Sequence, residues 1–259
     1  MERQPNILGL PINALPMSGV LAKIDAWIAG GERKFISTAD VHALVSALGD
    51  PAIRRVYESA TMVTADGMPL VWYLRKNGFP NAERVCGPDL LTTLIARSQD
   101  TGHRHFFYGA SPNTLARMKE RMARECPRTA IAGMYSPPYR ELSAAEQREI
   151  DDLINAARPD IVWVGLGAPK QDRWMVAHRA GLNAGVLIGV GAAFDMYAGT
   201  VRRAPRIVRQ TGLEWTFRVA QEPRRLAKRY VVSNSRFAAM VIAERLGRAT
   251  HPSGARGIE

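Results

Sequence analysis

The sequence predicts an α/β fold with a mostly parallel sheet and helices on both faces, followed by a basic helical C-terminal appendage. Over the first 199 residues, short apolar runs alternate with helical patterns, as they do in βαβ units. Turns rich in glycine and alanine follow several of these runs. After Gly199 the pattern changes to arginine-rich helical segments. We therefore expect one α/β domain over residues 1–199, the body, and a helical arm over residues 200–259.

Five strands are expected from runs rich in β-branched and aromatic residues: 34–37, 61–64, 104–108, 161–165 and 185–189. A helix is expected after the first strand, because apolar residues recur there at helical spacing. These residues are Val41, Leu44, Val45 and Leu48. The alternation of strand and helix along the body favours a parallel sheet, since parallel neighbours need a crossover connection.

Capping signals mark the ends of further helices. Ser111 precedes Pro112, which is the arrangement of an N-cap followed by a first-turn proline. Ser143 and Glu146 form a capping box that begins a helix running to about residue 157. Two glycines, Gly78 and Gly102, are expected to end other helices. In the arm, helices are expected over residues 213–220 and 236–246.

The basic charge is concentrated in the arm. The chain has a formal net charge of +11. Residues 200–259 hold 13 Lys and Arg against 4 Asp and Glu, a net charge of +9, whereas residues 1–199 hold 22 against 20. Such asymmetry indicates a polyanionic partner: phospholipid head groups, nucleic acid or a diphosphate substrate. Residues 236–246 form either an amphipathic helix at a membrane surface or a helix packed on the body.

Several classes of protein are disfavoured by the sequence. The N-terminal residues lack a basic segment followed by an apolar run, so we expect the chain to stay in the cytoplasm. No stretch approaches the roughly 18 apolar residues that span a bilayer, which predicts peripheral membrane contact at most. The two cysteines, Cys86 and Cys126, form no metal or disulfide pattern and are expected to be reduced thiols.

Polar and small residues follow the predicted strands, at the edge where an open parallel sheet binds ligands. Lys170 and Gln171 stand at an expected helix start, where a cation and an amide suit either a diphosphate or a solvated first turn. Three turns carry Gly109, Gly167 and Gly191. None completes G-x-G-x-x-G, and there is no Walker A motif. Three such turns at successive strand ends favour a nucleotide crevice over simple tight-turn geometry.

Asp66 is the first candidate for catalysis, because it follows a strand and precedes Gly67, which leaves its carboxylate uncovered. It suits a general base on a hydroxyl group, or alternatively a cap on the helix that begins near Pro69. No metal site is expected. His103 and His105 flank a strand without a third ligand in reach by spacing, and no D-x-D follows an apolar strand.

Together the motifs resemble the WecG/TagA/CpsF glycosyltransferases of bacterial surface-polymer synthesis. The matching body segments are 64–67 (TADG), 84–90 (RVCGPDL), 165–171 (GLGAPKQ) and 191–195 (GAAFD) with 198–199 (AG). Those of the arm are 203–205 (RAP), 212–215 (GLEW), Arg218, 222–224 (EPR) and 229–230 (RY). They occur in the family's order over roughly residues 35 to 235. The resemblance is specific because so many segments match at once.

The resemblance implies an inverting, metal-independent hexosyltransferase with a Rossmann-like body and no cofactor. It would move a sugar from a UDP-sugar to a polyprenyl-diphosphate-linked sugar at the inner face of the bacterial plasma membrane. Asp66 falls where the family places its catalytic base. On the donor side we place Thr38, Gly109, Gly167, Lys170, Gln171 and Gly191. On the acceptor side we place Asp40, Arg84, Arg218, Arg224 and Arg225, with the arm also meeting the anionic membrane surface.

The sequence departs from the family's pattern at two positions, and two other functions are also open. The family usually has Asn where this chain has Asp40, and Glu where it has Asp172, which leaves the donor sugar and the identity of the base undecided. A nucleic-acid-binding protein would also use the basic arm, but the chain has no recognisable binding motif, so we expect no nucleic acid partner. A nicotinamide-dependent oxidoreductase fits the fold class without the phosphate fingerprint. The oligomeric state is open, and includes a homo-oligomer.

Overall fold

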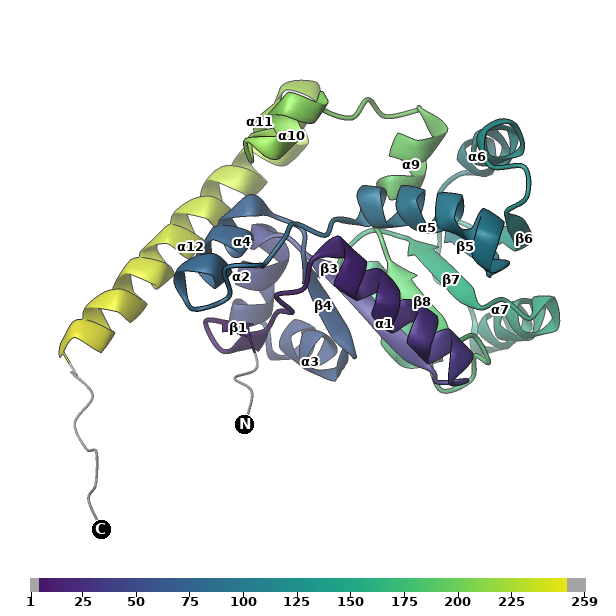
Figure 1. The fold of residues 1–259 in the computed structure, drawn as a ribbon, viewed down its shortest axis with the longest axis horizontal. Coiled ribbons are helices and arrows are strands. Elements are labelled where there is room, and N and C mark those ends of the chain that lie inside the picture. Colours follow the sequence, from purple (N-terminus) through teal and green to yellow (C-terminus); the bar gives the residue numbers. More distant parts are fainter. Residues whose placement is uncertain (1–4, 251–259) are drawn as a thin grey trace, which may run out of the picture.

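The computed structural model describes residues 5–250 (Figure 1); within this range the side chains of Arg206, Gln210, Arg225 and residues 248–250 are not described. A six-stranded sheet in the order β4-β3-β8-β7-β5-β6 forms its centre, with every neighbouring pair parallel. The strands are β3 (Lys34–Ala39), β4 (Met62–Ala65), β5 (Arg104–Gly109), β6 (Ala130–Tyr135), β7 (Ile161–Gly165) and β8 (Val186–Gly189). A hairpin of β1 (Asn6–Ile7) and β2 (Leu10–Pro11) lies beside it.

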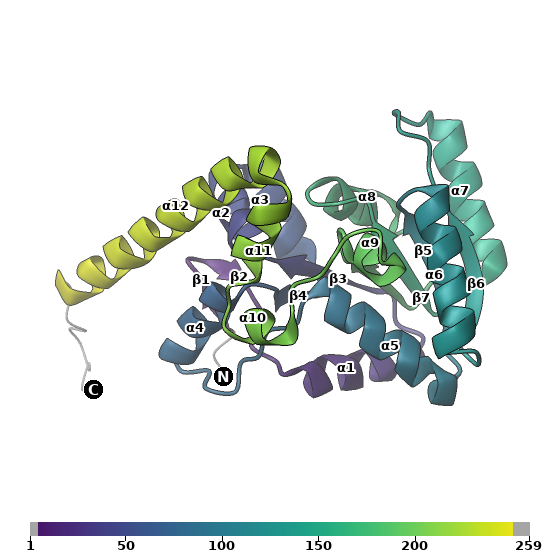
Figure 2. The same ribbon diagram turned by 90° about the horizontal axis from the view of Figure 1, so that it is seen from above.

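Helices cover both faces of the sheet (Figure 2), so the predicted α/β fold class is confirmed. One face carries α1 (Met17–Ala29), α5 (Gly87–Thr101), α6 (Pro112–Glu125) and α9 (Ala193–Ala198). The other carries α2 (Val41–Gly49), α3 (Pro51–Ser59), α7 (Ala144–Ala157) and α8 (Lys170–His178). Helix α4 (Met68–Lys76) packs beside β4 and β1.

The central strands β7 and β8 are apolar along their length because both of their faces are buried. In β7, Ile161 and Trp163 pack against α1, α5 and α6, whereas Val162 and Val164 pack against α7 and α8. All four are fully buried. The five predicted strands are therefore found, each within two residues of its expected ends.

The predicted caps are present. Ser111 accepts a hydrogen bond from the Thr114 amide, and Ser143 and Glu146 form the reciprocal capping box of α7. Gly102 ends α5 in the left-handed conformation, and Gly78 follows the end of α4 with positive φ. Strand β6 was not predicted. It is a half-buried edge strand paired to β5 through an irregular register, and two alanines and a glycine among its six residues give it a low strand propensity.

The arm consists of α10 (Arg206–Gln210), α11 (Glu214–Gln221) and the long α12 (Pro223–Thr250). Helices α10 and α11 lie over one end of the molecule, and α12 runs away from them along α2 (Figure 1). Phe237 is buried, and its ring centroid lies 6.4 Å from that of Tyr73 in α4. The expected helix over 236–246 is thus part of α12, and its Phe237 side packs on the body.

The opposite side of α12 is exposed: Ile242 and Leu246 keep 58% and 63% of their accessible surface. Polar contacts also fix the helix, since the Nδ1 atom of His42 lies 2.9 Å from Ser233 Oγ. Within residues 5–250, no helix has the length and apolar character needed to cross a membrane.

Candidate active site

A pocket of about 100 Å³ lies between the carboxyl ends of β3 and β4 and the arm. The body contributes Asp40, Asp66 and Arg84 to its lining. The arm contributes Glu214, Trp215, Arg218 and Tyr230. Four predicted site residues, Asp40, Asp66, Arg84 and Arg218, therefore meet in one cavity, although residues 66 and 218 are far apart in the sequence.

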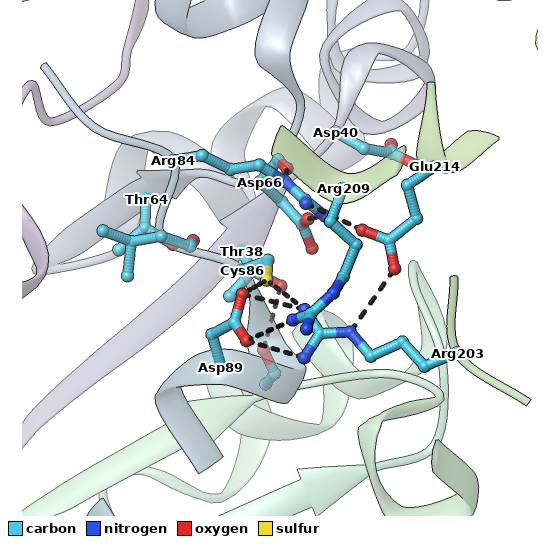
Figure 3. Close-up of polar contacts among 12 residues, drawn as sticks. Thr38, Asp40, Thr64, Asp66, Arg84, Cys86, Asp89, Arg203, Arg209 and Glu214 are labelled. Carbon is cyan, nitrogen blue, oxygen red and sulfur yellow. Dashed lines mark hydrogen bonds and ion pairs between the residues drawn. The ribbon is translucent and has the colours of Figure 1, made fainter. Parts of the chain in front are cut away.

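Asp66 follows β4 directly, and Arg84 holds it in place (Figure 3). Arg84 Nη2 lies 3.2 Å from Asp66 Oδ1, and its Nε donates to the backbone carbonyl of Asp66. The side chain of Asp66 keeps 26% of its surface, on the pocket side. The N-cap residue of helix α4 is Gly67, and no side chain caps the helix, so the alternative that Asp66 caps it is wrong.

Electrostatics favour a proton-accepting role for Asp66. Burial raises the pKa of its carboxyl above the usual range, and the charge of Arg84 opposes this rise. The neighbouring carboxylates of Asp40 and Glu214 raise the pKa further. A carboxylate with a raised pKa binds a proton more strongly than a solvated one, as a general base at neutral pH requires.

Asp40, the first departure from the family pattern, is held by two contacts. Its Oδ1 accepts a hydrogen bond of 2.8 Å from the Ala43 amide and thereby caps α2. Its Oδ2 lies 3.3 Å from Arg229 Nη2 of α12. The added carboxylate thus has a cationic partner in the arm.

Ion pairs join the arm to the body beside Asp66 (Figure 3). Arg203 contacts both carboxylate oxygens of Asp89, at 2.6 and 2.8 Å, and Arg209 lies 3.2 Å from the same carboxylate. Arg203 Nε also lies 3.4 Å from Glu214 Oε1, and Arg84 Nη1 lies 2.7 Å from Glu214 Oε2. The charged groups therefore form a continuous series from α5 through the arm to Asp66.

The predicted donor residues do not line this pocket. They lie along the same edge of the sheet, at the ends of β3 and β5 (Thr38, Gly109) or after β7 and β8 (Gly167, Lys170, Gln171, Gly191). Thr38 Oγ1 donates to the Gly189 carbonyl at 3.2 Å. Buried Gln171 accepts a hydrogen bond of 2.8 Å from the Gly191 amide. These two contacts fix the turn after β8.

Two of the glycines have different roles. A Cβ atom on Gly109 would lie 2.6 Å from the Gly165 carbonyl oxygen, so glycine is needed there for strands β5 and β7 to approach. At Gly167, by contrast, a Cβ atom would meet nothing within 4 Å, which leaves open space above the strand end. Lys170 is exposed, and its Nζ lies 5.7 Å from the ring centroid of Tyr139.

One expected arm residue, Arg224, does not line the pocket. Arg224 is exposed in the first turn of α12, and the side chain of Arg225 lies outside the described part of the structure. Sequence reasoning missed Glu214, Asp89 and Arg229 as parts of the site. All three stand inside the matching segments 212–215, 84–90 and 229–230, which was the available signal.

Asp172, the second departure, does not face the pocket. It is 1% exposed, and its Oδ1 accepts a hydrogen bond of 2.8 Å from Ser37 Oγ of β3. Its Oδ2 has no hydrogen-bond partner within the described part of the chain. Burial raises the pKa of Asp172 to about 6, and the hydrogen bond from Ser37 opposes the rise. The departure at this position is thus a feature of the core.

We expect Asp172→Asn to stabilise the protein at pH 8 but not at pH 4. The folded state raises the pKa of Asp172 above the unfolded value of about 3.9, so it binds the proton more tightly. The resulting stabilisation is complete below about pH 4 and is lost as the pH rises through 6. Asn keeps the shape without the charge, and should raise the free energy of unfolding at pH 8 by up to about 3 kcal/mol.

Urea denaturation at both pH values measures this effect. Asp152→Asn, on the exposed face of α7, is the matched control and should behave alike at pH 4 and pH 8. A variant at Asp172 that is less stable than the wild type at pH 8 would contradict the prediction.

The matching family model is described as the glycosyl transferase WecG/TagA/CpsF family and covers residues 5–251. The protein is therefore a glycosyltransferase. It belongs to the WecG/TagA/CpsF family, as its motifs indicated. The expected hexosyltransferase class is confirmed, and the nicotinamide-dependent oxidoreductase is contradicted.

A relative from Bacillus spizizenii (strain W23) is 36% identical over 191 residues, which are 74% of this chain and 72% of the relative. It is an N-acetylglucosaminyldiphosphoundecaprenol N-acetyl-beta-D-mannosaminyltransferase. Within residues 5–250, no three His, Cys, Asp or Glu side chains are arranged to hold a metal ion.

Proposed function

We propose that the protein is an inverting, metal-independent glycosyltransferase that moves a hexose or N-acetylhexosamine from a UDP-sugar to a polyprenyl-diphosphate-linked sugar. The product would serve the synthesis of a bacterial surface polymer. The observation that carries the proposal is Asp66, placed at a strand end with its carboxylate on a pocket lined by Arg84 and Arg218. This pocket combines a base for a hydroxyl group with cations for a diphosphate.

The sheet topology supports a donor site along the edge that continues from this pocket. Strand β5 connects through α6 to β6 on one side, whereas β7 connects through α8 to β8 on the other. The topological switch point, where open α/β sheets bind ligands, therefore falls between β5 and β7. Gly109 ends β5, and Gly167 follows β7. Four strand spacings separate β4 from β5, about 19 Å, which suits an elongated nucleotide-diphosphate sugar.

Beside the switch point lies a larger hollow of about 710 Å³, lined by Tyr108, Tyr139, Lys170 and Trp174 among others. Its aromatic rings offer stacking surfaces for a base, and Lys170 offers a cation for phosphate. The donor would then run from this hollow, past Gly191, toward Asp66. Its sugar would reach the pocket, which is where transfer must occur.

Arg218 is the best candidate for the acceptor diphosphate. It lines the pocket, and no carboxylate pairs with its guanidinium in the described part of the chain. Its charge is thus available to an anionic ligand, whereas Arg84, Arg203 and Arg229 are already paired. The relative from Bacillus spizizenii is named for an acceptor of the polyprenyl-diphosphate class.

In the proposed reaction, the acceptor hydroxyl attacks the anomeric carbon from the face opposite UDP. Asp66 takes the hydroxyl proton as the new glycosidic bond forms and the bond to the UDP oxygen breaks. UDP leaves with the bonding electron pair, and the configuration at the anomeric carbon inverts. Positive side chains and backbone N–H groups along the donor edge would stabilise the charge that develops on the diphosphate.

The direct test is transfer by the purified chain, with a panel of UDP-sugars and a short-chain polyprenyl-diphosphate-sugar acceptor. The product mass identifies the sugar moved, and its anomeric configuration by NMR tests inversion. Activity in the presence of a chelator tests metal independence. Transfer from no UDP-sugar in the panel would contradict the proposed donor class.

We further propose that the arm docks the protein on the inner face of the plasma membrane. Apolar side chains are exposed beside the pocket: Trp72 at 48%, Leu213 at 49% and Ile207 at 75%. Trp72 lies next to Gly212: a Cβ atom added to Gly212 would be 3.3 Å from the Trp72 ring. Exposed apolar groups in a basic arm and on the neighbouring α4 suit an anionic lipid surface.

The chain is therefore expected to sediment with vesicles that contain anionic lipid at about 0.05 M salt, and to dissociate largely at about 1 M salt, where the Debye length is only about 3 Å. Neutral vesicles are the control. Double-stranded DNA tests the nucleic-acid alternative: binding to DNA as strong as that to anionic vesicles would contradict membrane docking as the specific role of the arm.

A further inference from the structure

Glu214, at the start of α11, is a buried carboxylate between two arginines. It is 8% exposed. Arg84 of the body lies 2.7 Å from its Oε2, and Arg203 of the arm lies 3.4 Å from its Oε1. Burying a carboxylate costs free energy unless nearby cations compensate its charge. At Glu214 the two arginines provide this compensation.

Arg84 is shared between Glu214 and Asp66. Its Nη1 contacts Glu214, while its Nη2 contacts Oδ1 of Asp66 at 3.2 Å. A guanidinium binds a carboxylate most strongly when two of its nitrogens engage the two oxygens in parallel. Because Glu214 occupies Nη1, Arg84 makes only a single side-chain contact to Asp66. The other bond, from Nε, goes to the backbone carbonyl of Asp66.

The position of Glu214 depends on how the arm is seated on the body. Arg203 bridges Glu214 to Asp89 of α5, and Arg209 pairs with the same Asp89. These contacts hold the first turn of α11 against the body. The arm thereby fixes the distance between Glu214 and Arg84.

We propose that Glu214 is a positioning residue for sugar transfer: by holding one nitrogen of Arg84, it prevents Arg84 from neutralising Asp66 completely and so keeps Asp66 basic. This inference rests on the proposed function, in which Asp66 is the base. Two effects of Glu214 act in the same direction. Its negative charge disfavours a second negative charge nearby, and its contact with Arg84 weakens the pairing of Arg84 with Asp66.

The test is the pH dependence of kcat/KM for Glu214→Gln. Without the charge at residue 214, Arg84 is free to pair more fully with Asp66. The acid limb, which is the fall of kcat/KM at low pH, should then move about one pH unit lower. The plateau value of kcat/KM should fall about tenfold, because a weaker base accepts the proton less readily. Glu214→Asp keeps the charge and should keep the acid limb within a few tenths of a unit of the wild type.

Glu149→Gln, on the exposed side of α7, removes the same charge away from the pocket and should leave the profile unchanged. Thermal unfolding of each variant shows whether it folds. A Glu214→Gln enzyme that loses activity without a shift of its acid limb has only a structural defect, and this result overturns the inference. An unchanged profile and rate also overturn it.

Asp66→Asn separates this inference from the proposed function. Wild-type turnover by that variant would refute Asp66 as the base, whatever the behaviour of Glu214. If Asp66→Asn is inactive but the acid limb of Glu214→Gln stays at the wild-type pH, only the role of Glu214 is refuted.

Discussion

Asp66→Asn is expected to lower kcat by about a thousandfold, within the range that general-base catalysis supplies. Asn has nearly the same shape as Asp and still accepts a hydrogen bond from Arg84 Nη2, which lies 3.2 Å from Oδ1 in the wild type. It cannot take up a proton. The affinity for UDP, measured by calorimetry, should therefore stay at the wild-type value while transfer is lost.

Asp40→Asn is the informative companion, because Asp40 lines the same pocket. Asn at this position retains the oxygen that caps α2 and loses only the charge opposite Arg229. We expect its kcat to fall far less than that of Asp66→Asn. The reverse order, with Asp40→Asn inactive and Asp66→Asn active, would identify Asp40 as the base.

Arg218→Ala is expected to reduce kcat/KM for the acceptor by about fiftyfold, since charged hydrogen bonds contribute about 1.5–3 kcal/mol. The assay uses a soluble, short-chain acceptor, so that membrane docking makes no difference. Most of the effect should appear as a higher KM for the acceptor diphosphate, because Arg218 is proposed to bind it in both the ground state and the transition state.

Arg236→Ala serves as the matched control, since Arg236 is exposed on the same arm and outside the pocket lining. It should leave the soluble assay unchanged. If Arg218→Ala also keeps full activity on the soluble acceptor, the arm contributes membrane contact but not acceptor binding.

The sheet was predictable from the sequence where strands are buried on both faces. Strands β7 and β8 are nearly continuous apolar runs, and such runs do not depend on distant partners. Edge strand β6 is half-buried and contains two alanines and a glycine, which have low strand propensity, so it was missed. Local rules likewise found the caps at Ser111 and Ser143, because capping involves residues only three positions apart.

The candidate site was only partly predictable, because it depends on contacts between distant segments. The charge of the arm indicated an anionic partner, but not that Arg203, Arg209 and Arg229 are paired with carboxylates of the body. The distinction between paired and available arginines requires the tertiary structure. So does the finding that Asp172, which looks like a site residue by its position in the sequence, is buried against Ser37.

The pairing of Asp40 with Arg229 limits how this enzyme can be recombined with its relatives. A chimera that joins this arm to a relative's body with an amide in place of Asp40 would leave Arg229 facing a neutral group. The same chimera would carry a guanidinium without its carboxylate partner next to a pocket-lining position, where it would attract phosphate groups indiscriminately. Successful domain shuffling would therefore require the two segments, or at least these two positions, to be exchanged together.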